Sequence, residues 1–173
     1  MKQRMVAIAL AGVCLGAAGS LWAADKVELT TRVSGVVEEV LVKPGQRVKK
    51  GAVLLRLDKT VLQARLDEAA AEQVRADADE ADARRELERA EELFNRTVSS
   101  TSELEASTLR HARAKSALAT ANARLVIAKK NLSDADLKAP FNGVVNAVPG
   151  APGTVVAADC QPKPLVIMSS GQP

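Results

Sequence analysis

A repeated pattern of valine, glycine and proline near the two ends of the chain constrains the fold more than any other feature. Residues 33–48 (VSGVVEEVLVKPGQRV) superpose on residues 141–156 (FNGVVNAVPGAPGTVV) at a constant offset of 108 positions. Both copies read as short β-branched strands separated by Gly and Pro turns. Neither copy holds more than about three strands, too few for a stable sheet, so we expect the two halves to pack on each other. Five glycines of the repeat are predicted to be structural turn residues: Gly35, Gly45, Gly51, Gly143 and Gly153.

The segment between the two copies, residues 59–132, must therefore leave the β unit and return to it. It contains no Pro and no Gly and is rich in Ala, Glu and Arg, which favours helix. A break near 95–101 divides it into two antiparallel arms, each roughly 35 residues and about 50 Å long. The predicted fold class is therefore α+β, with β halves at 25–58 and 133–173 around a helical hairpin.

Heptad spacing of Ala and Leu predicts how the two arms pack. Each arm alternates steps of three and four residues, as in a coiled coil, and Gln73 and Glu80 are the polar exceptions. Ser100 and Ser102, each three residues before an acid, are predicted to cap the second arm. His111 lies on an extension of the second seam, and we expect it to be structural or solvated rather than a ligand. The predicted seam comprises Leu62, Leu66, Ala69, Ala76, Ala83, Leu87, Ala90 and Phe94 in the first arm, and Ala114, Leu118, Ala121, Leu125, Ala128 and Leu132 in the second.

The first 24 residues have the order of a secretory signal peptide. Lys2 and Arg4 precede an apolar run at 5–18, and small residues follow up to Ala24. The apolar run is shorter than the ~18–20 residues that span a bilayer, so we expect cleavage near Ala24, with an uncleaved anchor as the alternative. Cleavage would leave Cys160 as a single thiol, either a simple loop residue or the site of an intermolecular disulfide.

Composition argues against several classes of function. Aromatic residues make up 2% of the chain and Lys+Arg 24 nearly balance Asp+Glu 21, which is unlike a nucleic-acid-binding face. One His and two Cys without CxxC or HExxH spacing predict no metal site. No nucleophile and base are paired by motif around His111, so we expect neither an enzyme nor a cofactor.

The two β halves around a long hairpin resemble the lipoyl-like β-sandwich, or barrel-sandwich hybrid, of periplasmic adaptor proteins. These are the membrane fusion proteins of the HlyD and RND efflux adaptor type. The resemblance is carried by GVVEEVLVKPGQRVKKGAVLLRLD at 35–58 and LKAPFNGVV at 137–145, and it covers about residues 27–170. It implies a subunit on the inner-membrane side of the periplasm that links an RND or ABC inner-membrane transporter to a TolC-like outer-membrane channel. It also implies self-association into a ring, commonly of six copies.

Three residues at the predicted hairpin tip match the family's channel-contact motif, an Arg, a Leu four residues later and a Ser seven after that. Arg89, Leu93 and Ser100 stand at this spacing, so the resemblance implies that they contact the channel. Efflux adaptors continue into a β-barrel domain and a membrane-proximal domain. We therefore expect this chain to be a short form that lacks both.

Two other functions are compatible with parts of the sequence. A lipoyl or biotin carrier would use Lys59, but Lys59 follows Gly51 by eight residues instead of about ten, opens a predicted helix and is not part of an MKM tripeptide. A periplasmic scaffold or chaperone would use the same coiled coil to bind a protein other than an outer-membrane channel.

Overall fold

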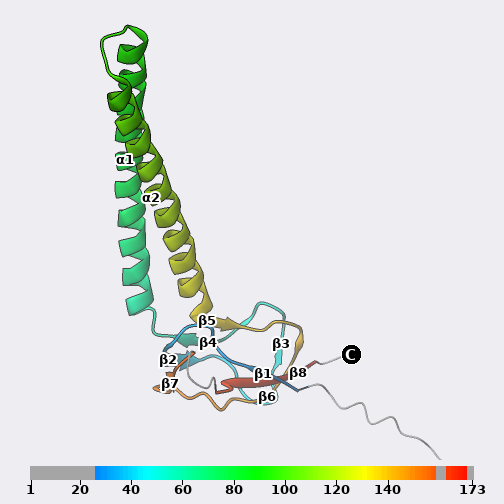
Figure 1. Cartoon of the computed structure of the whole chain (residues 1–173). Coiled ribbons are helices and arrows are strands. Elements are labelled where there is room, and N and C mark those ends of the chain that lie inside the picture. The colour runs from blue at the N-terminus through cyan, green and yellow to red at the C-terminus, as the bar shows by residue number, and fades with distance from the viewer. Residues whose placement is uncertain (1–25, 159–162, 171–173) are drawn as a thin grey trace, which may run out of the picture.

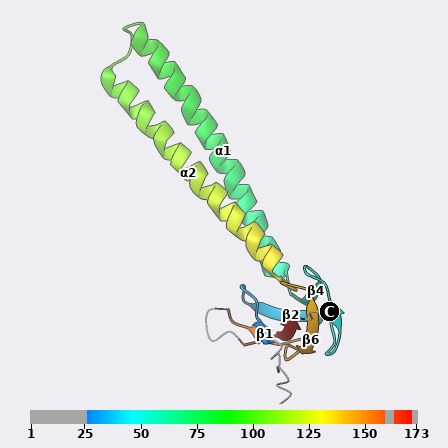
Figure 2. The ribbon, with the colours of Figure 1, turned by 90° about the vertical axis from the view of Figure 1, so that its right-hand side faces the viewer.

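The described part of the chain consists of a small β domain and a long helical hairpin that rises from it (Figures 1 and 2). The computed structural model describes residues 26–158 and 163–170, so the predictions for the signal peptide and for Cys160 lie outside the described residues. Helices α1 (Thr60–Asn95) and α2 (Thr101–Asp134) form the hairpin. The strands are β1 (Lys26–Leu29), β2 (Gly35–Val40), β3 (Arg47–Val48), β4 (Val53–Leu57), β5 (Asp136–Lys138), β6 (Gly143–Ala147), β7 (Val155–Val156) and β8 (Val166–Ser170).

The strands form two four-stranded sheets, and each sheet draws strands from both halves of the chain. The strand order is β1-β8-β6-β3 in one sheet and β5-β4-β2-β7 in the other, with antiparallel pairing throughout. Each sheet combines strands from before and after the hairpin. Neither half of the repeat can therefore form a complete sheet alone. The predicted fold, a β-sandwich split by an α-helical hairpin, is confirmed.

The strand register repeats with the same offset as the sequence. β2 pairs with β7 through Gly35 and Val156, and β6 pairs with β3 through Gly143 and Val48, which is the same pairing displaced by 108 residues. The repeat in the sequence therefore corresponds to an approximate two-fold relation between the two sheets in space.

Three of the five glycines lie in turns that need a left-handed backbone. Gly45, Gly51 and Gly153 have φ values of 84°, 85° and 85°, which glycine adopts at little cost. The equivalent pair Gly45 and Gly153 each donate a backbone hydrogen bond to the opposite half, to the carbonyls of Val145 at 2.7 Å and Val37 at 2.8 Å. These turns therefore also join the two halves.

The other two glycines are strand residues and differ from the turn role expected for them. Gly35 and Gly143 are the first residues of β2 and β6 and have no left-handed φ. A Cβ at Gly143 would lie 2.3 Å from the backbone oxygen of Ser169 in β8, whereas a Cβ at Gly35 would meet Leu57 at 3.5 Å, an ordinary contact. Close strand approach therefore explains the glycine at 143.

The core lies between the two sheets and extends to the root of the hairpin. Leu54, Leu55 and Leu57 of β4 have no exposed surface, and neither does Ala135, which follows α2. The remaining buried members of this cluster are Val33, Val37, Val42, Val48, Leu62, Ala139, Val145, Val156, Leu165, Val166 and Met168. Leu62 packs on this cluster, so the root of the hairpin is anchored in the β-domain core.

The hairpin seam follows the Ala and Leu spacing along most of its length. Ala76 and Ala83 of α1 are buried, as are Ala121 and Ala128 of α2, and small side chains allow the two helices to approach closely. Phe94 differs from its predicted seam position, because 38% of its surface is exposed one residue before α1 ends. No helix among the described residues contains a stretch that is long and apolar enough to cross a membrane.

Candidate functional site

The far end of the hairpin carries the three residues predicted for channel contact. Arg89 and Leu93 lie one helical turn apart in the last two turns of α1, and 45% of the Leu93 surface is exposed. The Arg89 side chain is exposed, and no ion pair found among the described residues includes it. The guanidinium and the leucine therefore face solvent on one side of α1.

Ser100 has a structural role at the same end of the molecule. It is the N-cap of α2, and its hydroxyl oxygen accepts a hydrogen bond from the backbone N–H of Glu103 at 3.3 Å. The Glu103 carboxylate accepts a hydrogen bond from the Ser99 hydroxyl at 2.8 Å. Ser102 lies inside the first turn of the helix, so the cap is provided by Ser100 and not by Ser102. The hydroxyl hydrogen of Ser100 remains available to a partner.

The turn between the two helices is a Schellman motif with an unusual residue at its left-handed position. The N–H of Val98 bonds to the carbonyl of Leu93 at 3.0 Å, and the N–H of Thr97 bonds to that of Phe94 at 2.9 Å. Thr97 has φ 61°, a conformation that glycine usually fills and that strains a β-branched side chain. The tip therefore has a defined backbone held in a strained conformation.

Two apolar side chains beside Leu93 also belong to the exposed tip. Phe94 is 38% exposed and Val98 is 73% exposed. The heptad spacing places Phe94 in the seam, whereas Val98 lies outside both predicted seams. A signal for Val98 was available, since an apolar residue inside a polar helix connection has no core to fill. The tip thus presents a small apolar group flanked by Arg89.

The polar seam residues Glu80 and His111 form a pair across the hairpin. His111 Nε2 lies 3.0 Å from Glu80 Oε1, and the side chains are only 22% and 15% exposed. The contact explains the polar exception at Glu80, because Glu80 and His111 satisfy each other inside a seam made mostly of Ala and Leu. It also fixes the register of α1 against α2.

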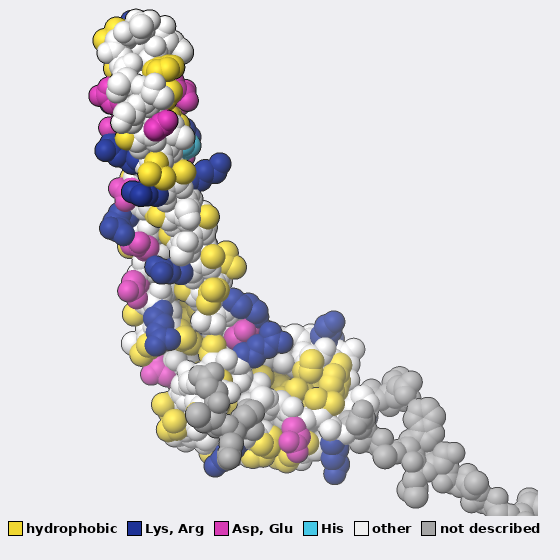
Figure 3. Space-filling model, viewed as in Figure 1, with side chains coloured by type: hydrophobic (Ala, Val, Ile, Leu, Met, Phe, Trp, Pro, Cys, Tyr) yellow, Lys and Arg dark blue, Asp and Glu magenta, His cyan; other side chains and the backbone are white. Residues whose placement is uncertain are grey.

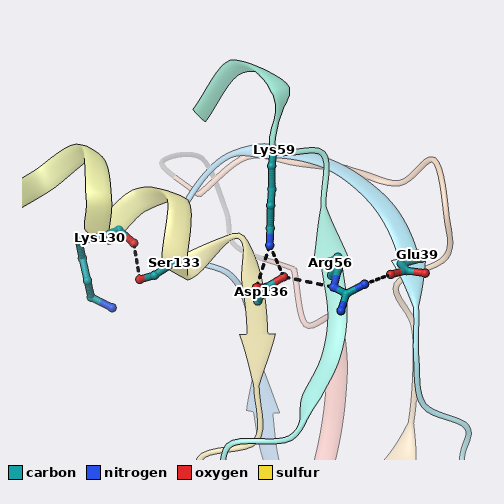
Figure 4. Close-up of polar contacts among 6 residues, drawn as sticks. All are labelled: Glu39, Arg56, Lys59, Lys130, Ser133 and Asp136. Carbon is teal, nitrogen blue, oxygen red and sulfur yellow. Dashed lines mark hydrogen bonds and ion pairs between the residues drawn. The ribbon is translucent and has the colours of Figure 1, made fainter. Parts of the chain in front are cut away.

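At the root of the hairpin the chain passes from the β domain into α1 and returns to it after α2. A charged network joins these two crossings (Figure 4). The ammonium of Lys59, the residue before α1, lies 2.8 Å from the carboxylate of Asp136, the first residue of β5 and the second residue after α2. Arg56 of β4 approaches the same carboxylate at 3.5 Å and also pairs with Glu39 of β2. Asp136 is 20% exposed, so the network sits partly inside the junction and links both helix roots to the sheet.

Charged side chains cover much of the hairpin surface, and several pair within it (Figure 3). Arg110 of α2 forms a hydrogen-bonded ion pair with Glu86 of α1, which joins the two helices. This contact raises the pKa of Arg110. The hydrogen bond with Arg75 lowers the pKa of Glu72. The Asp58 carboxylate accepts a hydrogen bond from the backbone N–H of Thr60, the first residue of α1, at 2.8 Å, and this bond lowers the pKa of Asp58. No three His, Cys, Asp or Glu side chains within the described ranges are grouped as metal ligands.

Comparison with known proteins finds relatives of the same architecture. Residues 25–162 match the family described as the CzcB-like, barrel-sandwich hybrid domain. The chain is 31% identical over 149 residues to the efflux pump periplasmic linker BepF of Brucella suis, covering 86% of this chain and 36% of that protein. It is 29% identical over 147 residues to the periplasmic linker BepD of the same organism, covering 85% and 37%.

A solved structure shares the fold along most of the chain. The membrane fusion protein Spr0693 of Streptococcus pneumoniae superposes with a TM-score of 0.63 at 20% identity, covering 84% of this chain and 59% of that protein. This chain therefore spans a little over a third of the length of the two linkers and more than half of the solved protein.

Proposed function

We propose that this chain, which belongs to the CzcB-like barrel-sandwich hybrid family of membrane fusion proteins, is a periplasmic adaptor subunit of a tripartite efflux or secretion system. In this role the hairpin tip binds a TolC-like outer-membrane channel, and the β domain lies on the side of an inner-membrane transporter of RND or ABC type. Residues 1–24 act as the signal peptide that brings the chain to the periplasm. Copies of the chain associate in a ring, and the family resemblance implies six copies.

The observation that carries this proposal is the construction of the hairpin. Its helices of 36 and 34 residues extend about 50 Å from a small β domain, far beyond what that domain needs for its own core. The capped and ordered turn at the far end holds Leu93, Phe94 and Val98 in solvent. Apolar side chains left exposed at the end of a long projection support a role in contacting another protein.

The three tip residues offer different contacts to a channel. Arg89 supplies a guanidinium that is free of ion pairs among the described residues and suits a carboxylate or backbone carbonyls of the partner. Leu93 supplies an apolar knob on the same helix face. Ser100 holds the start of α2 and can still donate its hydroxyl hydrogen, so its substitution is expected to disturb both the tip and the contact.

The proposal is tested by cross-linking from single cysteines to a purified TolC-like channel in detergent. In a Cys160→Ser background, Leu93→Cys is expected to capture the channel. Val61→Cys is the matched control, because Val61 is also an exposed aliphatic residue of α1 (61%) but lies at the root. Adding Arg89→Ala to Leu93→Cys is expected to reduce capture about tenfold, equivalent to about 1.4 kcal/mol. Equal capture from the two cysteines, or none from Leu93→Cys, would contradict the proposal.

A scaffold or chaperone is the second candidate, and the same experiment in whole envelopes separates it. Capture of other envelope proteins by Leu93→Cys, with no outer-membrane channel among them, would favour the scaffold. The carrier function is disfavoured by the Lys59 ammonium, which is bound to Asp136 at the root of a helix and is not carried on the tip of a β-hairpin. A lipoyl or biotinyl mass increment on Lys59 would reverse that judgement.

A further inference from the structure

A groove lies between the two helices on one flank of the hairpin, close to its root. It has a volume of about 800 Å³ and is lined by residues from 62–75 of α1 and 124–131 of α2. At a rise of 1.5 Å per residue its α1 side is about 20 Å long. The volume falls within the roughly 300–1,000 Å³ of sites that bind drug-sized molecules. We call this cavity the root groove.

Aliphatic side chains form the inner part of the root groove. Leu62 and Ala128 are seam residues with 7% and 9% of their surface exposed, and Ala69 lies between them and the next turn of α1. Ile127 lines the same groove but is 59% exposed. An aliphatic side chain in this position gains free energy when an apolar ligand covers it and removes it from water.

Charged side chains surround this aliphatic part, and they are not balanced. The charged lining residues are Arg65, Glu68, Glu72, Arg75 and Arg124. Glu72 already accepts two hydrogen bonds from Arg75, at 2.8 and 3.1 Å. None of the ion pairs found within residues 26–158 and 163–170 includes Arg65, Glu68 or Arg124. Two guanidiniums and one carboxylate therefore remain, an excess of one positive charge.

The next stretch of the same flank differs in its charges. A smaller cavity of about 390 Å³ is lined there by Asp79 and Asp82 of α1 and by Arg110 and Arg113 of α2. The charged α1 residues of both cavities each stand one position before a seam residue, which puts the two cavities on the same side of the helix. In the smaller cavity two acids face two bases, and Glu86 also pairs with Arg110. The positive excess beside an aliphatic surface therefore distinguishes the root groove.

We propose that the root groove binds a small amphiphilic anion, a free molecule with an aliphatic body and one acid group. The aliphatic body lies on Leu62, Ala69 and Ile127, and the acid group binds Arg65 and Arg124. A guanidinium suits this role because its N–H groups match the two oxygens of a carboxylate. This inference goes beyond the proposed function, because binding at the root requires no channel.

The shape of the groove favours a free molecule over a lipid in a membrane. An aliphatic chain can lie along the groove for about 20 Å only if the whole molecule has left the bilayer. Arg65, Ile127 and Arg124 are exposed at the groove, so part of the ligand stays in water and the binding is expected to be weak. For dodecanoate, with about 14 non-hydrogen atoms, we expect a Kd of about 0.1–1 mM.

Methyl NMR of the isoleucine-labelled chain tests the proposal directly. The chain has three isoleucines, Ile8, Ile127 and Ile167, of which Ile127 lines the groove and Ile167 lies in β8 of the β domain. Dodecanoate, added below its micelle concentration, is expected to shift the Ile127 methyl signal until saturation and to leave Ile167 unchanged. Dodecyltrimethylammonium has the same aliphatic chain and the opposite charge, and we expect it to bind at least about tenfold more weakly.

Three outcomes of this titration would overturn the proposal. They are the absence of a saturable Ile127 shift, equal shifts of Ile127 and Ile167, and equal affinities for the two probes. Vesicles of phosphatidylglycerol address the membrane source of the same chemistry. Sedimentation of the chain with these vesicles, without binding of free dodecanoate, would also overturn it.

Substitutions of the charged lining residues form the second arm of the test. Arg65→Gln and Arg124→Gln are each expected to raise the Kd for dodecanoate about threefold to tenfold, in chains of unchanged helical circular dichroism. Arg113→Gln is the matched control, because Arg113 lies on the same flank but outside the root groove. Glu68→Gln removes a charge of the same sign as the ligand and is expected to lower the Kd about twofold. An equal effect of all three arginine substitutions, or no effect of any, would contradict the assigned site.

The outcome is separate from that of the channel experiment, since the titration contains no channel. The groove ends at Arg75, about 27 Å along α1 from Leu93. Binding of dodecanoate without channel capture by Leu93→Cys would contradict only the proposed function. Channel capture without binding of dodecanoate would contradict only this inference.

Discussion

The internal repeat provides a matched pair of substitutions, Gly143→Ala and Gly35→Ala. The two glycines occupy equivalent first positions of β6 and β2, yet their surroundings differ. A Cβ at 143 would lie 2.3 Å from the carbonyl oxygen of Ser169 and 3.2 Å from the ring of Phe141, while the nearest atom to a Cβ at 35 is 3.5 Å away. The same chemical change is therefore expected to have opposite consequences.

The magnitudes follow from these contacts. A backbone atom cannot move aside as a flexible side chain can, so Gly143→Ala must displace β6 from β8 by about 1 Å, which costs about 1–3 kcal/mol for overpacking. Weakened strand hydrogen bonds add about 1 kcal/mol. Gly35→Ala causes no clash and reduces the entropy of the unfolded chain, so it should be neutral or stabilising by up to about 1 kcal/mol.

Thermal unfolding measured by calorimetry distinguishes the two variants. For a chain of this size 1 kcal/mol corresponds to about 2–4 °C in Tm, so Gly143→Ala should lower Tm by about 4–16 °C while Gly35→Ala leaves it unchanged or raises it slightly. Calorimetry is preferable to helical circular dichroism, because the hairpin dominates the latter signal. We attribute the loss of stability in Gly143→Ala to the close approach of β6 and β8 and not to a general need for glycine. Equal shifts in Tm for the two variants would refute this explanation.

Three further perturbations probe the tip, the root and the start of α1. Thr97→Gly is expected to raise the free energy of unfolding by about 0.5–1 kcal/mol in urea titrations, because it relieves the left-handed strain of a β-branched residue at φ 61°; a loss of stability would contradict the strain. Asp136→Ala is expected to speed hydrogen exchange of the Leu57 amide, which bonds to the carbonyl of Ala135 at 2.9 Å, with unchanged exchange in mid-hairpin as the control. The hydrogen bond from Thr60 lowers the pKa of Asp58, so this bond stabilises the fold above pH 3.8, and its contribution is lost as the pH falls below that value. Acid titration of the Asp58→Ala variant should lack this loss of stability.

The β domain could be predicted from the sequence because its two halves repeat. Valines, glycines and prolines that match at one offset reveal equivalent strands and turns without any knowledge of the pairing. The pairing of Gly35 with Val156 and of Gly143 with Val48 then follows the same offset. The different environments of the two glycines could not be predicted, because they depend on how closely β6 approaches β8 in space.

The contacts across the hairpin could not be predicted, although each helix could. Heptad spacing indicates which side of a helix packs but not which turn of α1 meets which turn of α2. The sequence alone therefore does not pair Glu80 of the first arm with His111 of the second, which lie 3.0 Å apart in the structure. The left-handed turn at Thr97 had no glycine to mark it, and the junction of Lys59 with Asp136 joins residues separated by 77 positions.

The root network and the tip are mechanically connected by the length of the hairpin. A helix of 36 residues is about 54 Å long, so a rotation of about 6° at the root displaces the tip by about 6 Å, a full side-chain length. The two crossings at the root are held by the buried Leu62 and by the Asp136 carboxylate between Lys59 and Arg56. Contacts of Arg89 and Leu93 with a partner require the tip to be held far more tightly than that. Substitutions at Asp136 should therefore weaken capture at the tip even though they leave the tip residues unchanged.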